Sequence, residues 1–177
     1  MTNIEKLFSE DEIAERVATL ASDIVDRVGT DFVVIGVLKG AFVFMADLVR
    51  ALDLAGAAPR VELMRLSSYG RGMTTSGEVK LIGNTPDDFE GKPVILVDDI
   101  VDTGLSMTYG RDLLTGRNAE KVWTCALLDK PSRRKVAIKA DFVGFEIEDV
   151  FVVGYGIDYA ERFRHLPYIG LVQETDS

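Results

Sequence analysis

The spacing of apolar residues near the start of the chain predicts a long amphipathic helix. Between residues 9 and 28, apolar side chains recur every three or four positions, which is the period of one helix face. These positions are Ile13, Val17, Leu20, Ile24 and Val28. Ser9 and Glu12 have the spacing of a capping box, and Gly29 is suited to end a helix. We therefore predict a helix over Ser9–Val28.

Continuous apolar runs elsewhere predict strands that are buried on both faces. Phe32–Leu38 is such a run, and the mostly apolar segment Ala41–Leu52 after it predicts a helix. Val94–Val97 predicts a second buried strand, which ends at two acids and is followed by a predicted helix over Leu105–Leu114. Further strands are predicted at Val61–Leu66, Glu78–Ile82, Lys121–Leu128, Asp141–Ile147 and Phe151–Gly154. Strands that alternate with helices are typical of an α/β fold with a parallel sheet.

The segment Ser68–Gly77 (SYGRGMTTSG) is small, polar and rich in glycine, and it predicts a mobile loop between two of these strands. Thr85–Lys92 has the composition of a turn. No internal repeat, low-complexity segment or linker interrupts the chain, and 177 residues suit one domain. We therefore expect a single domain over residues 1–177.

Composition and charge exclude several classes of function. The net charge is −9 and the chain has no run of Lys and Arg, so binding to nucleic acid or to an anionic membrane surface is disfavoured. A single cysteine, Cys125, and a single histidine, His165, exclude an internal disulfide and the usual zinc sites, and neither is assigned a role. Any metal should be bound by oxygen, with magnesium ahead of zinc. Because we find no secretory signal and no apolar run of about 18 residues, we expect a soluble cytoplasmic protein.

One segment, Val94–Ser106 (VILVDDIVDTGLS), carries the candidate chemistry. Two acids end the apolar strand, Asp102 follows, and Thr-Gly-Leu-Ser then opens the predicted helix. Ligands of open α/β sheets bind beyond the carboxyl ends of strands, where a helix N-terminus offers amides to a phosphate. Gly104 permits a close approach of the backbone, and Thr103 adds a hydroxyl. A solvated acidic turn is the alternative, which the preceding buried strand disfavours. The mixture of carboxylates and an anion cradle predicts a ligand such as a sugar phosphate.

The segment VILVDDIVDTG resembles the signature of the type I phosphoribosyltransferases, which bind 5-phosphoribosyl-1-pyrophosphate (PRPP). Other segments resemble the hypoxanthine–guanine members of that family: GVLKGAFVFMADL, SSYGRGMTTSG, LLDKP, DFVGFEI and FVVGYGIDYAERFR. The resemblance extends from about Ile13 to Leu171. It implies the type I phosphoribosyltransferase fold, with a mostly parallel central sheet flanked by helices and a small hood from the terminal segments. Residues 68–77 would form the lid, with Ser68 and Tyr69 as its matching residues.

The resemblance also implies which residues bind PRPP. Leu38-Lys39-Gly40 matches a loop that contacts pyrophosphate, and whose Leu–Lys peptide is cis in some states. Asp98 and Asp99 match the acids that hold the ribose hydroxyls, and Asp102 lies with them at the same site. The 5′-phosphate cradle corresponds to Thr103, Gly104, Leu105 and Ser106. Some relatives carry a lysine in place of Leu105, so here the phosphate depends more on amides and hydroxyls.

The remaining matches concern the purine, the metal and catalysis. The implied purine-binding residues are Lys130 at the 6-oxo group, Phe151 stacked on the base, Val152 through its backbone, and Asp158. Asp158 also matches a magnesium ligand, and Asp98 and Asp99 are further metal candidates. The implied catalytic residues are Asp102 near N7 of the purine, Lys39, and Arg164 at the pyrophosphate. From the residues alone, Phe151 could equally pack in the core, and Arg164 could simply pair with Glu161 at helical spacing.

The reaction implied by the resemblance is Mg²⁺-dependent transfer of the phosphoribosyl group from PRPP to N9 of hypoxanthine or guanine, giving IMP or GMP and pyrophosphate in purine salvage. The implied partners are these small molecules and further copies of the chain, in a homodimer or homotetramer. One alternative is a phosphoribosyltransferase for another base, such as xanthine, adenine or a pyrimidine. Another is a non-catalytic nucleotide-sensing regulator of the same fold, which the acidic charge disfavours. The chain lacks a G-x-x-x-x-G-K-S/T loop and a complete dinucleotide fingerprint.

Overall fold

Helix α1 spans Glu10–Val28 in the computed structural model, which describes residues 3–68, 79–86, 89 and 91–173. The Ser9 hydroxyl accepts from the Glu12 amide at 3.3 Å, and the Glu12 carboxylate accepts from the Ser9 amide at 2.8 Å. The predicted capping box is therefore present, and it satisfies two amides that no helical carbonyl reaches. The helix ends at Gly29, as predicted.

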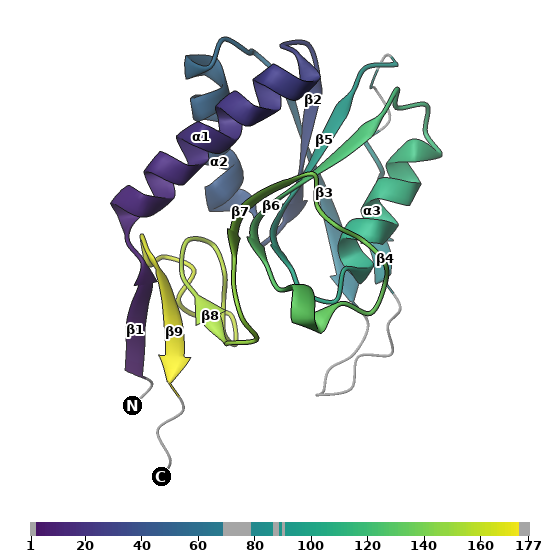
Figure 1. Ribbon diagram of the computed structural model, residues 1–177. Coiled ribbons are helices and arrows are strands. Elements are labelled where there is room, and N and C mark those ends of the chain that lie inside the picture. Colours follow the sequence, from purple (N-terminus) through teal and green to yellow (C-terminus); the bar gives the residue numbers. More distant parts are fainter. Residues whose placement is uncertain (1–2, 69–78, 87–88, 90, 174–177) are drawn as a thin grey trace.

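A six-stranded sheet forms the centre of the molecule (Figure 1). Its strands are β2 (Val33–Leu38), β3 (Arg60–Ser68), β4 (Val79–Ile82), β5 (Val94–Val101), β6 (Val122–Asp129) and β7 (Phe142–Glu146). Their order is β4-β3-β2-β5-β6-β7, and every neighbouring pair is parallel except β3 and β4. This confirms the predicted α/β fold with a mostly parallel sheet. The carboxyl ends of the parallel strands therefore lie along one edge.

Helices cover both faces of this sheet (Figure 1). On one face lie α1 and α2 (Phe42–Leu54), and on the other lies α3 (Leu105–Thr115). Along β2, Val34 packs in the core on the α1 and α2 side, whereas Ile35 packs in the core on the α3 side. Ile95 and Leu96 of β5 alternate in the same way. Because both faces are buried, these strands read as continuous apolar runs. Among the described residues, no helix is long and apolar enough to cross a membrane.

A second, three-stranded sheet lies beside the carboxyl edge of the large one. It consists of β1 (Asn3–Phe8), β8 (Val152–Val153) and β9 (Ile169–Gln173), in the antiparallel order β1-β9-β8. The ring of Phe8 stacks on Phe145 of β7, with 4.1 Å between centroids, which attaches this sheet to the large one. We did not predict β1 or β9, since no residue of β1 is buried and the strand carries no clear period. The strand predicted at Phe151–Gly154 is limited to the two residues of β8.

The predicted end of the strand at Val94–Val97 is wrong, because β5 continues to Val101. The parallel ladder with β6 continues through Asp98, which pairs with Ala126, and ends at Val101, which pairs with Asp129. The apolar pattern marks only the part of β5 that packs in the core. Asp98 and Asp99 consequently lie on a hydrogen-bonded strand instead of a loop.

A hairpin forms the β4 edge of the large sheet. The antiparallel pairing of β3 with β4 confirms the strands predicted at Val61–Leu66 and Glu78–Ile82 and joins them as a hairpin. Of the predicted mobile loop, only Ser68 at the end of β3 lies among the described residues, and Tyr69 lies outside them. After β6 the chain forms a short 3₁₀ helix, η1 (Pro131–Arg133), before it returns to β7.

Candidate active site

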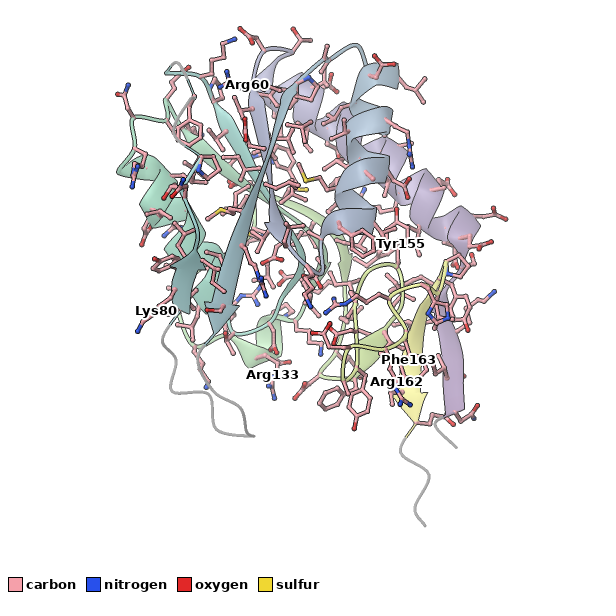
Figure 2. The ribbon with its side chains drawn as sticks, turned by 180° about the vertical axis from the view of Figure 1, so that it is seen from behind. Arg60, Lys80, Arg133, Tyr155, Arg162 and Phe163 are labelled. Carbon is pink, nitrogen blue, oxygen red and sulfur yellow. The ribbon has the colours of Figure 1, made fainter. Side chains whose placement is uncertain are left out.

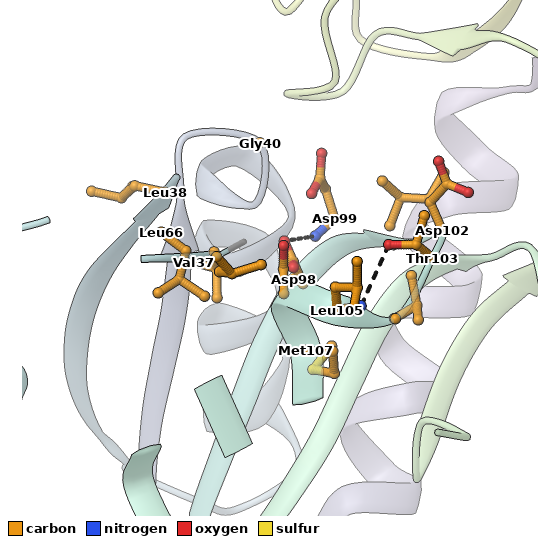
Figure 3. A pocket seen from close by; sticks show the side chains of 15 residues that line it. Val37, Leu38, Gly40, Leu66, Asp98, Asp99, Asp102, Thr103, Leu105 and Met107 are labelled. Carbon is orange, nitrogen blue, oxygen red and sulfur yellow. Dashed lines mark hydrogen bonds between the residues drawn. The ribbon is translucent and has the colours of Figure 1, made fainter. Parts of the chain in front are cut away.

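A pocket of about 310 Å³ lies beyond the carboxyl end of β5 (Figure 3). Its walls are the turn after β2 and the segment 98–107. From β2 the chain crosses to β3 on one side, whereas from β5 it crosses to β6 on the other. The pocket therefore lies at a point where the direction of winding reverses, which is where open α/β sheets bind ligands. The sequence predicted a site at this place.

The two acids at the end of β5 differ in their surroundings. Asp98 is 7% exposed, and its Oδ1 accepts a hydrogen bond from the Asp99 amide at 3.0 Å. Burial, followed by the negative charge of Asp99, raises the pKa of the Asp98 carboxyl well above its usual range. Burial also raises the pKa of Asp99. The Asp99 carboxylate lies against Gly40, where a Cβ atom would collide with it, so position 40 has no room for a side chain.

The N-terminus of α3 opens onto the same pocket. Gly104, with φ +83°, is the N-cap and provides no capping side chain. The Leu105 amide donates instead to the Thr103 hydroxyl at 3.4 Å (Figure 3), and Ser106 also lines the pocket. A Cβ atom on Gly104 would lie 2.5 Å from Ile138, so the turn requires glycine for both its conformation and its packing. The first amides of a helix have no intrahelical acceptor, and they suit an anion.

Asp102, in the turn between β5 and α3, is held by an arginine from another loop. Arg133 Nε donates to Asp102 Oδ1 at 2.9 Å, and its Nη1 lies 3.5 Å from Asp149. Figure 2 shows Arg133 and Arg60 at opposite ends of the large sheet, with Arg133 at the end that carries the pocket. We did not predict a role for Arg133. Its only signal in the sequence is its place three residues after Lys130.

Lys130 and Phe151 lie close to each other, and the charge of Asp102 acts on Lys130. Lys130 follows β6 directly, is 7% exposed, and places its Nζ atom 5.9 Å from the centroid of the Phe151 ring. Burial lowers the pKa of Lys130, and the charges of Asp102 and Asp149 oppose that shift. Phe151 is 69% exposed, which excludes the core-packing alternative for it. Val152, the next residue, is buried in β8.

Four charged side chains form a network at the turn after β2. Lys39 Nζ contacts Glu161 Oε2 at 3.0 Å, and Arg164 Nη2 lies 3.4 Å from the same oxygen. Arg164 also pairs with Asp158 Oδ1 at 2.7 Å, and Asp158 Oδ2 accepts from the Glu161 amide at 2.8 Å. The Leu38–Lys39 peptide is cis. The expected pairing of Arg164 with Glu161 is present, but the segment between them is not helical.

Apart from Val152 and the lid residues Ser68 and Tyr69, the predicted site residues thus fall into three groups around one edge of the sheet. The pocket at the end of β5 contains Gly40, Asp98, Asp99, Asp102, Thr103, Gly104, Leu105 and Ser106. The second group is Lys130 with Phe151, and the third is Lys39, Asp158 and Arg164. Within the part of the chain that the structure describes, no three His, Cys, Asp or Glu side chains converge as a ready-made metal site. Glu161 and Arg133 join these groups without having been predicted.

The burial of Asp98 predicts that the site reduces the stability of the fold. Burial raises the pKa of the Asp98 carboxyl in the folded protein, whereas in the unfolded chain this pKa is about 3.9. The free energy of unfolding therefore decreases as pH rises from about 3.9 through the higher pKa of the folded protein. Asp98→Asn should therefore raise Tm at pH 7 in buffer free of divalent cations, and this gain should disappear toward about pH 4. Thermal denaturation across this pH range measures the effect.

The control for this test is Asp26→Asn, on the exposed side of α1. It removes one carboxylate from water and should show no such pH-dependent gain. An Asp98→Asn protein that is less stable than the parent at pH 7 would contradict the prediction.

Comparisons with known proteins give a consistent result. The model of the phosphoribosyl transferase domain matches residues 3–160. A hypoxanthine phosphoribosyltransferase of Escherichia coli (strain K12) is 46% identical over 172 residues, which cover 96% of this chain and 95% of that protein. A hypoxanthine-guanine phosphoribosyltransferase of Bacillus subtilis (strain 168) is 47% identical over 173 residues, or 97% of this chain and 94% of that protein. A crystal structure of a hypoxanthine-guanine phosphoribosyltransferase from Bacillus anthracis has a TM-score of 0.88 at 40% identity, and the match covers 98% of this chain and 100% of that one.

Proposed function

Since this chain belongs to the phosphoribosyltransferase family, we propose that it is a purine-salvage enzyme that acts on hypoxanthine, guanine or both. It transfers the phosphoribosyl group of PRPP to N9 of the base and releases pyrophosphate. The observation that carries this proposal is the buried Lys130 beside the exposed ring of Phe151, adjacent to the acids and the helix N-terminus of the pocket. A cation and an open aromatic face together suit a flat base that carries an oxo group.

The pocket at the end of β5 would hold the sugar phosphate. Carboxylates accept hydrogen bonds from hydroxyls, and Asp98 and Asp99 offer them where the ribose would lie. The amides of Leu105 and Ser106 at the start of α3 would donate to the 5′-phosphate, together with the Thr103 hydroxyl. No cationic side chain lines this pocket among the described residues, so the cradle relies on amides, hydroxyls and the helix dipole.

The pyrophosphate would lie between Lys39 and Arg164. These two cations provide fixed positive charge where negative charge accumulates as the leaving group departs. Glu161 pairs with both of them. We propose that Glu161 takes the place of the anion and releases the cations when pyrophosphate arrives.

Mg²⁺ is the proposed cofactor, and the donor set fits it. Asp158 and Asp99 both line the pocket next to Lys39, and carboxylate oxygens are ligands that Mg²⁺ prefers. Mg²⁺ usually takes one or two carboxylates together with substrate phosphates, which agrees with the lack of a converged ligand cluster among the described residues. Asp158 would hold the ion, with Asp98 and Asp99 as further oxygen donors. When bound, the ion neutralises the charge of the pyrophosphate.

Asp102 and Lys130 would act on the base from neighbouring edges. Lys130 donates to the 6-oxo group, Phe151 stacks on the ring, and the Val152 backbone meets the opposite edge. Asp102 accepts a proton or a hydrogen bond at N7 as N9 attacks the sugar. Arg133 keeps the Asp102 carboxylate in one orientation. The sugar becomes oxocarbenium-like as its bond to pyrophosphate breaks, so water must be excluded, and Ser68–Gly77 with Tyr69 stays our prediction for the lid.

The same proposal includes the oligomeric state of the enzyme and its cellular compartment. We propose a homodimer or homotetramer, which the exposed apolar side chains of Phe42 and Leu54 on α2 support. We place the enzyme in the cytoplasm, where an activated sugar phosphate from the cell's own metabolism is available.

The test of the activity is nucleotide formation from PRPP and Mg²⁺ with hypoxanthine, guanine, xanthine and adenine in turn. Adenine should be a very poor substrate, because its 6-amino group would face the Lys130 ammonium, and two donors cannot pair. Sites built on such a contact reject the wrong partner by about 10⁴-fold or more. Efficient AMP synthesis by the parent protein would contradict the proposal.

Lys130→Met should damage turnover of hypoxanthine and leave the affinity for PRPP nearly unchanged. Methionine keeps much of the length of the side chain but removes the donor to the 6-oxo group, which we expect to cost roughly 1–3 kcal/mol. Steady-state kinetics with each substrate varied in turn measures both effects. Full activity of this variant with hypoxanthine would remove Lys130 from base recognition.

Asp102→Asn should lower the forward rate by about 10²–10⁴-fold, which is the usual contribution of a general acid or base. Asparagine keeps the size and one acceptor but cannot take a proton, so PRPP binding should change much less. Pre-steady-state turnover and calorimetric binding of PRPP separate the two quantities. A rate within about three-fold of the parent would exclude the proposed role.

Glu161→Gln should tighten the binding of pyrophosphate with Mg²⁺ by about 2- to 5-fold, since the ligand then no longer has to displace two exposed ion pairs, each of which contributes little. Isothermal titration calorimetry at low ionic strength measures the dissociation constant. Glu15→Gln, on the exposed face of α1, removes the same charge at a distance and should leave it unchanged. Equal or weaker binding by Glu161→Gln would show that Glu161 does not compete with the anion.

A further inference from the structure

We propose that Arg134 is a positioning residue that fixes Asp102 and Lys130 relative to each other. The inference rests on the proposed function, because it assigns Asp102 and Lys130 to two edges of one base. Arg134 itself does not line the pocket that contains Asp102. It contacts the backbone carbonyls of the two loops that carry those side chains.

The contacts of Arg134 join the ends of two neighbouring strands. Its Nη1 donates to the carbonyl of Val101 at 2.7 Å and of Asp102 at 2.6 Å, both at the end of β5. The same nitrogen lies 3.2 Å from the carbonyl of Lys130, just after β6. Its Nη2 pairs with Asp129, the last residue of β6. One guanidinium therefore connects both chain segments at the point where the sheet ends.

The rest of the side chain anchors this group. Arg134 Nε donates to the carbonyl of Ile138 at 3.1 Å, which closes the segment after β6 onto itself. The side chain is only 15% exposed, and its partner Asp129 is 7% exposed. Burial lowers the pKa of Arg134, and the Asp102 charge opposes this. A buried guanidinium with partners at all three nitrogens has little freedom to move.

The strand ladder alone does not supply this connection. The pairing of β5 with β6 ends at Val101 and Asp129, so Asp102 and Lys130 are the first residues beyond it. Among the described residues, two backbone hydrogen bonds continue the contact beyond the ladder: the Lys130 amide donates to the Val101 carbonyl at 3.0 Å, and the Lys135 amide donates to the Thr103 carbonyl at 2.9 Å. Lysine at position 134 would keep the charge but lose the planar fork that reaches several carbonyls at once.

Catalysis depends on this spacing because Asp102 and Lys130 must contact one rigid ring at the same time. A misplacement of about 1 Å can cost about 10²-fold in rate. Asp98 lies within the ladder, and the amides of Leu105 and Ser106 belong to α3, so these groups proposed to bind PRPP are held without Arg134. Loss of Arg134 should therefore affect the base far more than PRPP.

The test compares Arg134→Lys with Arg16→Lys. Arg16 on α1 also donates to two backbone carbonyls, Gly144 at 2.7 Å and Val143 at 2.6 Å, but it lies away from the site. Both variants should lower Tm. Arg134→Lys alone should lower kcat/KM for hypoxanthine by about 10- to 100-fold and reduce the preference for hypoxanthine over adenine, with the KM for PRPP within about three-fold of the parent.

A second arm does not depend on turnover. Hydrogen exchange should increase in the peptides 101–106 and 130–135 of Arg134→Lys, and it should stay at the parental level there in Arg16→Lys. If the parent makes no nucleotide from hypoxanthine, the proposed function fails, while this arm still decides whether Arg134 connects the two loops. Unchanged exchange in both peptides would overturn the inference. So would hypoxanthine kinetics within two-fold of the parent.

Should Arg134→Lys fail to fold, Asp129→Asn provides the second variant. It keeps Arg134 and removes only the charge that faces its Nη2. We expect a smaller loss of the same kind, in hypoxanthine turnover and not in PRPP affinity. Parental turnover and selectivity in Asp129→Asn would contradict the inference.

Discussion

The parallel pairing of β5 with both β2 and β6 is the interaction on which the rest of the site depends. It buries Ile95 and Leu96 on opposite faces of the sheet, and it continues far enough to carry Asp98 into the ladder. Burying a carboxylate costs folding free energy, whereas burying the apolar residues before it contributes free energy. The apolar first part of β5 thus stabilises the fold, whereas the buried Asp98 destabilises it. Such a loss of stability is common where function requires a residue that is unfavourable for folding.

That the lining residues of the pocket lie together could be predicted from the sequence because its parts are local. A strand, two acids, a turn and a helix N-terminus follow one another within Val94–Ser106, so their geometry depends on short-range structure. The end of β5 was predicted wrongly because a run of apolar residues indicates only which part of a strand is buried. A strand continues for as long as its backbone groups form hydrogen bonds with the neighbouring strand. Asp98 is polar and still pairs with Ala126. The amphipathic α1 and its capping box were predicted to within one residue, since both signals lie inside the helix.

Contacts between distant segments could not be predicted in the same way. Pairing of Asn3 with Gln173 joins the two ends of the chain, and β1 is too exposed to show a period. Arg133 and Arg134 stand in the sequence as two basic residues after Lys130. Their partners, Asp102 and the end of β5, lie about thirty positions earlier. Only the folded arrangement of the two loops shows that one arginine holds a carboxylate and the other holds the backbone.

An acidic chain that binds an anionic substrate needs positive charge or hydrogen-bond donors close to the binding site. The net charge is −9, yet the groups that we propose for phosphate binding are a helix N-terminus, Lys39 and Arg164. Each of these groups has an internal partner: Thr103 accepts from the first amide of α3, and Glu161 pairs with both cations. Such internal partners reduce the cost of holding the site open, and a charged ligand must displace them in order to bind. Arg134 is different, because its buried partners include backbone carbonyls that no substrate can replace. The ion pairs of Lys39 and Arg164 with Glu161 can thus be replaced when a ligand binds. The ion pair of Arg134 with Asp129 stays in place.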